Sequence, residues 1–95
     1  MRLIGRGILH DFKERHPDAA PRADSWMAET SEAQWDTPMD IKRRYPSASL
    51  LGDSQVIFNL QGNKYRLLVL VDYKNKTVLI KNAGTHQEYT KWPTR

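Results

Sequence analysis

The sequence predicts an α+β domain in which N-terminal helices pack on one face of an antiparallel sheet, with a short helix near the C-terminus. Apolar residues recur at helical spacing in residues 5–45, whereas residues 55–81 hold three runs rich in Leu, β-branched and aromatic residues. Short polar segments join these runs, and the runs follow the helices instead of alternating with them. With 95 residues, 39% of them hydrophobic, the chain is expected to form one domain over 1–95.

The first elements are expected to be a short strand and a helix. Residues 3–4 form an extended apolar opening, and residues 5–16 place apolar side chains on one side of a helix. Pro17 ends this helix, because its ring clashes with the preceding turn. The apolar positions of the helix are Ile8, Leu9 and Phe12.

Two more helices are expected before the sheet. Asp18 is placed to cap the second helix, and Pro21 is tolerated because it falls in the first turn. The third helix begins at residues 37–40, where Thr, Pro and Asp supply an N-cap, a first-turn proline and an acid, and it stops before Tyr45 and Pro46. The apolar stripe of the second helix consists of Ala23, Trp26, Met27 and Thr30.

The second half predicts an antiparallel meander. Its strands are expected at residues 55–60, 64–73 and 76–81, with a further short strand at 49–51, before Gly52 and Asp53. Residues 67–71 are apolar at every position, so this strand should be central and buried on both faces. Gly84 breaks the strand pattern. Thr85 and Glu88 then have the spacing of a capping box, which predicts a helical turn through Trp92, before Pro93.

Composition excludes several classes of function. The absence of cysteine excludes disulfide scaffolds, thiolate metal sites and cysteine nucleophiles. The three histidines, His10, His16 and His86, form no ligand pair at helical spacing, and the glycines form no phosphate-binding loop. We therefore expect no metal and no cofactor, and any chemistry must use side chains alone.

Hydropathy gives no membrane signal. No segment approaches the ~20 apolar residues that cross a bilayer, and Gly5, Arg6 and Gly7 interrupt the apolar opening that a signal peptide would need. A cytoplasmic protein without a membrane partner is expected.

The net charge of +4 is unevenly distributed. Residues 1–40 carry five Lys or Arg and eight Asp or Glu, a net charge of −3, whereas residues 41–95 carry ten against three, a net charge of +7. A domain with one basic half has a surface suited to a polyanion, and nucleic acid is the common one.

Two cations at the start of the longest strand are candidates for phosphate binding. Alternation along residues 64–73 places Lys64 and Arg66 on the same face, before the apolar run begins. Arg suits a phosphodiester because its planar fork engages two oxygens at once. The alternative is a solvated strand start, with Lys64 in water and Arg66 paired with an acid. That alternative is favoured for Lys64, and both interpretations stay open for Arg66.

His86 is a candidate for proton transfer. The capping box makes Thr85 the N-cap and His86 the first helical residue, where a neutral imidazole could serve as a general base. Tyr89 lies three residues further on the same helix face and could present its hydroxyl to the same substrate. Glu88 is explained by its capping role and is not assigned to catalysis. The alternative is that His86 is a surface histidine beside a cap.

Other basic and aromatic residues complete the candidate surface. Residues 42–44 lie in the last turn of the third helix, where the helix dipole favours cations, and the same residues could bind phosphate. Trp26 and Trp35 are expected in the core, whereas Trp92 could border a substrate groove. The candidate RNA- or phosphate-binding residues are Lys42, Arg43, Arg44, Lys64, Lys81 and Lys91.

Two segments carry a resemblance to a known family. The segments F-N-L-Q-G-N-K-Y-R-L at 58–67 and T-H-Q-E-Y at 85–89, with the opening M-R-L-I-G and Y-P-S at 45–47, resemble the HigB toxins. These toxins are RelE-like members of type II toxin–antitoxin systems. The resemblance implies a RelE-like α+β endoribonuclease that cleaves mRNA, commonly mRNA held in the ribosomal A site. It also implies a cognate HigA-like helix-turn-helix antitoxin as a partner.

The chemistry that the resemblance implies fits the candidate residues. An RNA substrate carries its own nucleophile, the ribose 2′-hydroxyl, so the reaction requires no serine, cysteine or metal. On this interpretation Arg66 contacts the transition-state phosphate, His86 transfers a proton, and Tyr89 orients the substrate or transfers a second proton. Lys64 is a weaker phosphate contact, and Asn63 shapes the turn.

Two other functions stay open on the sequence alone. One is a non-catalytic RNA-binding or regulatory module that uses the same basic sheet face. The other is an inactive toxin relative that binds an antitoxin-like partner. The chain also departs from strongly basic relatives, because its first 40 residues are acidic. The +7 half could dock on the ribosome, and the helical half could contact the antitoxin.

Overall fold

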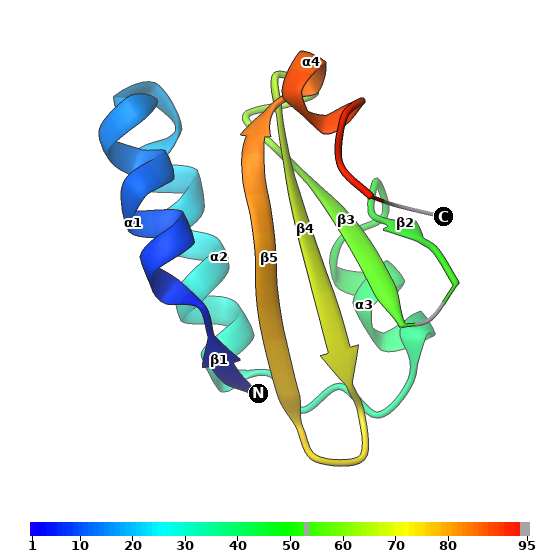
Figure 1. Cartoon of the computed structure of the whole chain (residues 1–95). Coiled ribbons are helices and arrows are strands. Elements are labelled where there is room, and N and C mark those ends of the chain that lie inside the picture. The colour runs from blue at the N-terminus through cyan, green and yellow to red at the C-terminus, as the bar shows by residue number, and fades with distance from the viewer. Residues whose placement is uncertain (53, 94–95) are drawn as a thin grey trace.

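The computed structural model describes residues 1–52 and 54–93, and its elements follow the order expected from the sequence (Figure 1). Asp53, expected just before the strand at residues 55–60, lies outside the described residues. None of the helices in the described ranges is long and apolar enough to cross a lipid bilayer. The elements are β1 (Arg2–Ile4), α1 (Arg6–Arg15), the 3-10 turn η1 (Pro17–Ala19), α2 (Ala20–Glu32), α3 (Pro38–Arg44), β2 (Ser49–Leu50), β3 (Gln55–Leu60), β4 (Tyr65–Asp72), β5 (Thr77–Thr85) and α4 (His86–Tyr89).

The sheet has five strands in the order β1-β5-β4-β3-β2, so β4 is its central strand. Strands β2 to β5 form the predicted antiparallel meander. β1 pairs with β5 in parallel, which makes the sheet mixed. The prediction of a buried central strand is confirmed, because Leu67, Leu68, Val69 and Val71 are buried and Leu70 is half-buried.

The helices pack on one face of the sheet. Figure 1 shows α1 and α2 side by side, with α3 beyond β3. Gly5 allows α1 to begin directly after β1, because its φ is 91° and a Cβ there would lie 2.7 Å from the carbonyl oxygen of Ile80. The predicted apolar stripe of α2 is confirmed as buried. The start of α3 is also confirmed, since the Asp40 carboxylate accepts hydrogen bonds from the backbone N–H groups of Asp36 and Thr37.

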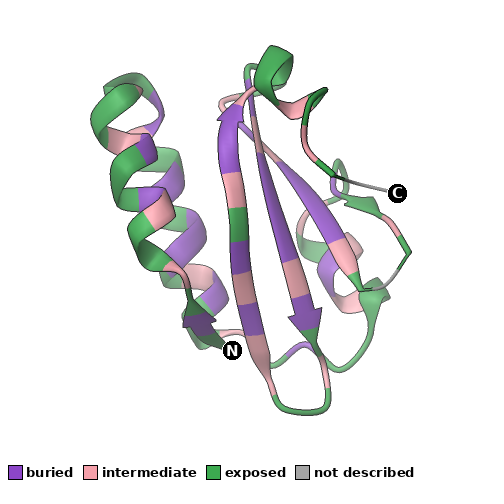
Figure 2. Cartoon of the chain, viewed as in Figure 1, coloured by how far each residue is buried: buried purple, intermediate pink, exposed green. Residues whose placement is uncertain are grey.

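The hydrophobic core lies between the helices and the sheet. Figure 2 shows the buried residues on the inner sides of α1 and α2 and along the three long strands. Trp26 and Trp35 are buried there, as predicted, and both pack against the ring of Phe58. Tyr65, Leu67 and Val69 also belong to this core, so Arg66 and Leu68, which alternate with them, lie on the opposite face.

The prediction that Asp18 caps α2 is wrong. Asp18 lies inside η1, which runs directly into α2, so Ala19 occupies the N-cap position without a side-chain hydrogen bond. The Asp18 carboxylate instead accepts hydrogen bonds from the Lys64 ammonium at 2.8 Å and from the Tyr65 hydroxyl at 2.9 Å. Its partners come from the other half of the sequence, which local helix signals do not reveal.

The predicted face of Lys64 is wrong as well. The chain turns through Lys64, whose N–H donates to the Gln61 carbonyl, and β4 begins only at Tyr65. Strand alternation therefore starts one residue later than expected. The ammonium of Lys64 reaches Asp18 on the helical side of the molecule, whereas Arg66 lies on the face away from the core.

The end of β5 also differs from the sequence expectation. The strand continues through Gly84 to Thr85, because the start of β4 pairs with it, Arg66 opposite Gly84. A Cβ at residue 84 would lie 2.6 Å from Oε1 of Glu88, so the carboxylate would have to shift to admit a side chain there. α4 then ends at Tyr89 and not at Trp92, although the N–H of Trp92 still donates to the Tyr89 carbonyl at 3.0 Å.

Candidate active site

The capping box predicted at Thr85 is present and fixes the start of α4. The Thr85 hydroxyl accepts from the N–H of Glu88 at 3.1 Å, and Oε1 of Glu88 accepts from the N–H of Thr85 at 2.8 Å. This backbone hydrogen bond is the main reason that the pKa of Glu88 is lowered from its usual value of 4.5, and the charges of Arg15 and His16 lower it further. Glu88 is therefore an ionised structural residue, as the sequence indicated.

His86 and Tyr89 lie together on α4. His86 is the first residue of the helix and is exposed, and its ring stacks against that of Tyr89 with a centroid distance of 6.1 Å and an interplanar angle of 27°. The N–H of His86 also donates to the Lys64 carbonyl, just before β4. The end of β5 and the start of β4 thus hold the backbone of His86 at one end of the sheet.

Arg66 joins this pair from the central strand. Its guanidinium lies over the ring of Tyr89, with Cζ 5.9 Å from the centroid, and Nη1 donates to the Asn63 carbonyl at 2.9 Å. Within residues 1–52 and 54–93, no carboxylate forms a salt bridge with Arg66. The described acids thus do not pair with Arg66, and phosphate binding by Arg66 stays a prediction.

Trp92 extends the aromatic surface. Its ring is half-buried and meets that of Tyr89 edge to face at a centroid distance of 5.6 Å. Arg66, His86, Tyr89 and Trp92 form what we call the Arg66 cluster. The three residues predicted to be catalytic are thus neighbours in space, although 20 positions separate Arg66 from His86 in the sequence.

Lys64 does not belong to the Arg66 cluster. Its ammonium pairs with Asp18 and lies 5.4 Å from the centre of the Tyr65 ring. The hydrogen bond from Lys64 is the main cause of the lowered pKa of Asp18, and the same bond raises the pKa of Lys64. The Lys64 side chain therefore pairs with an acid and does not lie beside Arg66. Pairing with an acid was considered for Arg66, but in the structure it is Lys64 that forms such a pair.

The basic turn of α3 lies away from the Arg66 cluster. Ile41 anchors α3 in the core between helices and sheet, on the face opposite Arg66. The three cations of this turn all have partners within the chain. Lys42 donates to the carbonyls of Pro46 and Ala48, Arg43 pairs with Asp40, and Arg44 pairs with Glu29.

Lys81 and Lys91 are exposed, Lys81 on β5 and Lys91 just after α4. Neither forms a salt bridge with the acids of the described residues. Phosphate binding by these lysines and by residues 42–44 stays a prediction.

Sequence reasoning missed two residues around the Arg66 cluster. Asn59 pairs with Arg66 across β3 and β4, and its side chain amide donates to the Ser47 carbonyl. The strand register of a hairpin with a turn at 61–64 could have revealed this pairing. Arg15, at the end of α1, lies 3.5 Å from Glu88, and no local pattern connects these two residues.

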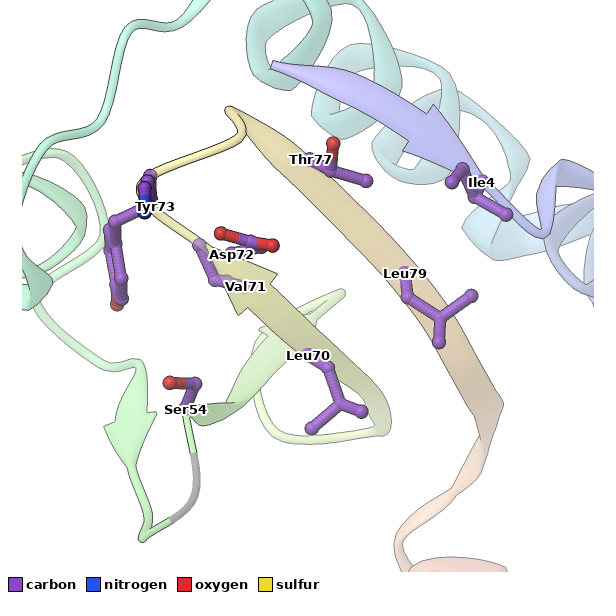
Figure 3. Close-up of a pocket in the computed structure, with 9 residues that line it drawn as sticks. Ile4, Ser54, Leu70, Val71, Asp72, Tyr73, Thr77 and Leu79 are labelled. Atoms are coloured by element: carbon purple, nitrogen blue, oxygen red, sulfur yellow. The ribbon is translucent and has the colours of Figure 1, made fainter.

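A separate pocket lies further along the sheet. Figure 3 shows Leu70 and Leu79 from neighbouring strands, with Ile4 from β1 beside them. The pocket holds about 570 Å³ and is mostly apolar. Leu70 is four residues beyond Arg66 on β4, roughly 13 Å along the strand. The lining of this pocket includes none of the residues of the Arg66 cluster.

The side chains that could bind a metal ion are not grouped around one point in the described ranges. No group of three His, Asp or Glu side chains among them is placed to hold one ion.

The fold and the Arg66 cluster define a small RelE-like domain, with helices on one sheet face and a cationic, aromatic cluster on the other. A sequence profile of the HigB toxins, described as the RelE-like toxic component of a toxin–antitoxin system, matches residues 19–92. The chain therefore belongs to the HigB toxin family, which confirms the resemblance carried by its two motifs.

Curated relatives agree with this assignment. The mRNA interferase toxin HigB of Escherichia coli strain K12 is 25% identical over 91 residues, which cover 94% of this chain and 88% of the relative. The mRNA interferase HigB of Shigella flexneri gives the same values. The mRNA interferase HigB of Escherichia coli O6:H1 is 20% identical over 93 residues, covering 96% of this chain and 90% of the relative.

Proposed function

We propose that this toxin is an endoribonuclease that cleaves mRNA through attack of a ribose 2′-hydroxyl on the adjacent phosphodiester. Cleavage of mRNA would inhibit translation and growth. The relatives described above carry the name mRNA interferase, which supports the substrate class. The observation that carries the proposal is the Arg66 cluster, in which a guanidinium without a carboxylate partner among the described residues, a tyrosine and an exposed histidine meet on the sheet face away from the core.

Each residue of the cluster matches a step of the reaction. The 2′-oxygen attacks phosphorus and loses its proton to a base, while the bond to the 5′-oxygen breaks and that oxygen gains a proton. His86 is exposed at the start of α4, where a substrate can reach its ring, so it is assigned to proton transfer. Arg66 supports the charge on the phosphoryl oxygens, and Tyr89 orients the substrate or transfers the second proton.

The surroundings of the cluster fit a polymeric substrate. Lys81 on β5 and Lys91 just after α4 are exposed cations, and Trp92 offers an aromatic face beside Tyr89. A long RNA can lie across such a surface without entering a cavity. We include ribosome-bound mRNA among the substrates, and a HigA-like helix-turn-helix antitoxin as the partner that neutralises the toxin.

The test is cleavage of a defined mRNA by purified protein, with and without translating ribosomes. Wild-type protein should give products with a 2′,3′-cyclic phosphate and a 5′-hydroxyl. His86→Ala should abolish these products, and Tyr89→Phe should reduce them. His10→Ala is the matched control, because His10 is an exposed histidine on α1, and it should cleave like wild type.

The same assay separates the enzyme from a binding module. A non-catalytic module would bind RNA with an affinity that falls as salt rises, and it would leave every transcript intact under all conditions. Intact mRNA in both the free and the ribosome-bound reactions would contradict the proposal.

A further inference from the structure

α4 carries two residues of the Arg66 cluster, yet little packing holds it in place. It has four residues, and none of them is buried. Isolated helices shorter than about 12 residues are marginal in water, so α4 depends on contacts with the rest of the chain for its position. The capping box joins α4 to Thr85, the last residue of β5, and therefore fixes one end of the helix only.

Besides the cap and the hydrogen bond from the N–H of His86 to the Lys64 carbonyl, one arginine of the helical half contacts α4. Nη1 of Arg15 lies 3.5 Å from Oε2 of Glu88, and Nη2 of Arg15 donates to the Ala83 carbonyl at 3.4 Å. The other carboxylate oxygen of Glu88 accepts from the N–H of Thr85. Arg15 therefore bridges the end of α1 to the end of β5 and to α4, through what we call the Arg15–Glu88 clasp.

Gly84 supplies the space that the clasp needs. A Cβ at this position would lie 2.6 Å from Oε1 of Glu88, which is the oxygen that accepts from Thr85. A Cβ at residue 84 would therefore require the Glu88 carboxylate to shift from its position between Thr85 and Arg15. The glycine, the arginine and the glutamate therefore meet at the junction of β5 and α4.

From these contacts we propose that Arg15 is a positioning residue for the reaction: through Glu88 it holds α4 so that Tyr89 lies over Arg66 and His86 faces the substrate. The inference rests on the proposed function and deepens it, because it assigns a role to a residue that touches none of the Arg66 cluster. Arg15 and Glu88 are half-exposed, with side-chain exposures of 50% and 47%, so their pairing contributes little to global stability. A positioning role and a purely structural role thus predict different outcomes.

The test compares Arg15→Ala and Glu88→Gln with Lys13→Ala as the matched control. Lys13 also forms an ion pair from α1, with Asp24 at 2.6 Å, on a part of the helix that does not reach α4. Arg15→Ala and Glu88→Gln should each lower the RNA cleavage rate about fivefold, near the upper limit for one exposed ion pair. Their Tm should match that of the Lys13→Ala protein, which should cleave like wild type.

Two measurements report the position of α4 without RNA. Nuclear Overhauser contacts between the Tyr89 ring and the Arg66 side chain should weaken in both variants, and the amide of His86, which donates to the Lys64 carbonyl, should exchange faster. Arg15→Lys keeps the charge and should recover part of the rate and of both signals. Gly84→Ala should reproduce the loss by displacing Glu88.

The outcomes separate this proposal from the proposed function. If Arg15→Ala keeps the Tyr89–Arg66 contacts, the slow exchange and the full rate, the positioning role is wrong. If the rate falls while both signals stay unchanged, Arg15 acts by contacting RNA, which also overturns the proposal. If wild-type protein does not cleave RNA, the proposed function fails, whereas the two RNA-free signals still decide whether the clasp positions α4.

Discussion

Replacement of Arg66 by alanine separates the catalytic account from a structural one. The side chain makes two contacts in the described structure, a hydrogen bond to the Asn63 carbonyl and a cation–π contact with Tyr89. A net hydrogen bond contributes about 1 kcal/mol and an exposed cation–π contact about 0.5–1 kcal/mol. Arg66→Ala should therefore lower the free energy of unfolding by only about 1–2 kcal/mol.

The effect on cleavage should be larger. Removal of one preorganised group that stabilises developing charge typically lowers kcat by about 10²–10³, or roughly 2.7–4 kcal/mol of transition-state stabilisation. Arg66→Lys keeps the positive charge and loses the planar fork, so its rate should fall between those of alanine and wild type.

The assay measures kcat/KM on one RNA together with urea unfolding of the same preparations. Lys74→Ala is the matched control, because Lys74 is an exposed cation in the turn between β4 and β5, at the opposite end of the sheet. It should leave both quantities within about twofold or 0.5 kcal/mol of wild type. A rate for Arg66→Ala within tenfold of wild type, in a folded protein, would refute the role assigned to Arg66.

Three further predictions concern the framework of the domain. Gly5→Ala should destabilise the fold by about 1–3 kcal/mol, measured by urea unfolding, because residue 5 has a positive φ and its Cβ would meet the Ile80 carbonyl. Phe58→Ala should cost about 3–5 kcal/mol in the same measurement, since this ring is 1% exposed at the centre of the aromatic core. Lys64→Ala should raise the pKa of Asp18 toward its usual 3.8, followed by NMR titration of the carboxyl group, because Lys64 is the main cause of its depression. In wild type the stabilisation from Asp18 is present above pH 3.8 and is lost as the pH falls through the lowered pKa of the folded state. An unchanged titration of Asp18 in the Lys64→Ala protein would contradict that pairing.

Local sequence signals predicted most of the fold. The helix starting at Pro38, the strand Gln55–Leu60 and the cap at Thr85 lie where the patterns placed them, because each depends on residues that are close in sequence. The errors arose where distant residues decide the outcome. β5 extends through Gly84 because the start of β4 pairs with it. Asp18 accepts hydrogen bonds from Lys64 and Tyr65 instead of capping α2.

The candidate site was predicted in part for the same reason. His86 and Tyr89 are neighbours on one short helix, so their proximity follows from spacing alone. Arg66 joins them because β4 and β5 pair in a particular register; the family resemblance assigned the three residues to one reaction, but neither it nor residue spacing gave this register. The contact between Arg15 and Glu88 depends on how α1 packs beside β5, and no sequence pattern encodes that contact.

The central claim is that this HigB family member cuts mRNA with the Arg66 cluster. Its most direct test is to map the 5′ ends of cellular mRNA after induction of wild-type protein and of the His86→Ala and Arg66→Ala variants. Wild-type protein should produce new 5′-hydroxyl ends within coding regions, and neither variant should produce them at equal levels of folded protein. Intact mRNA after induction of wild-type protein, or the same new ends in all three strains, would contradict it.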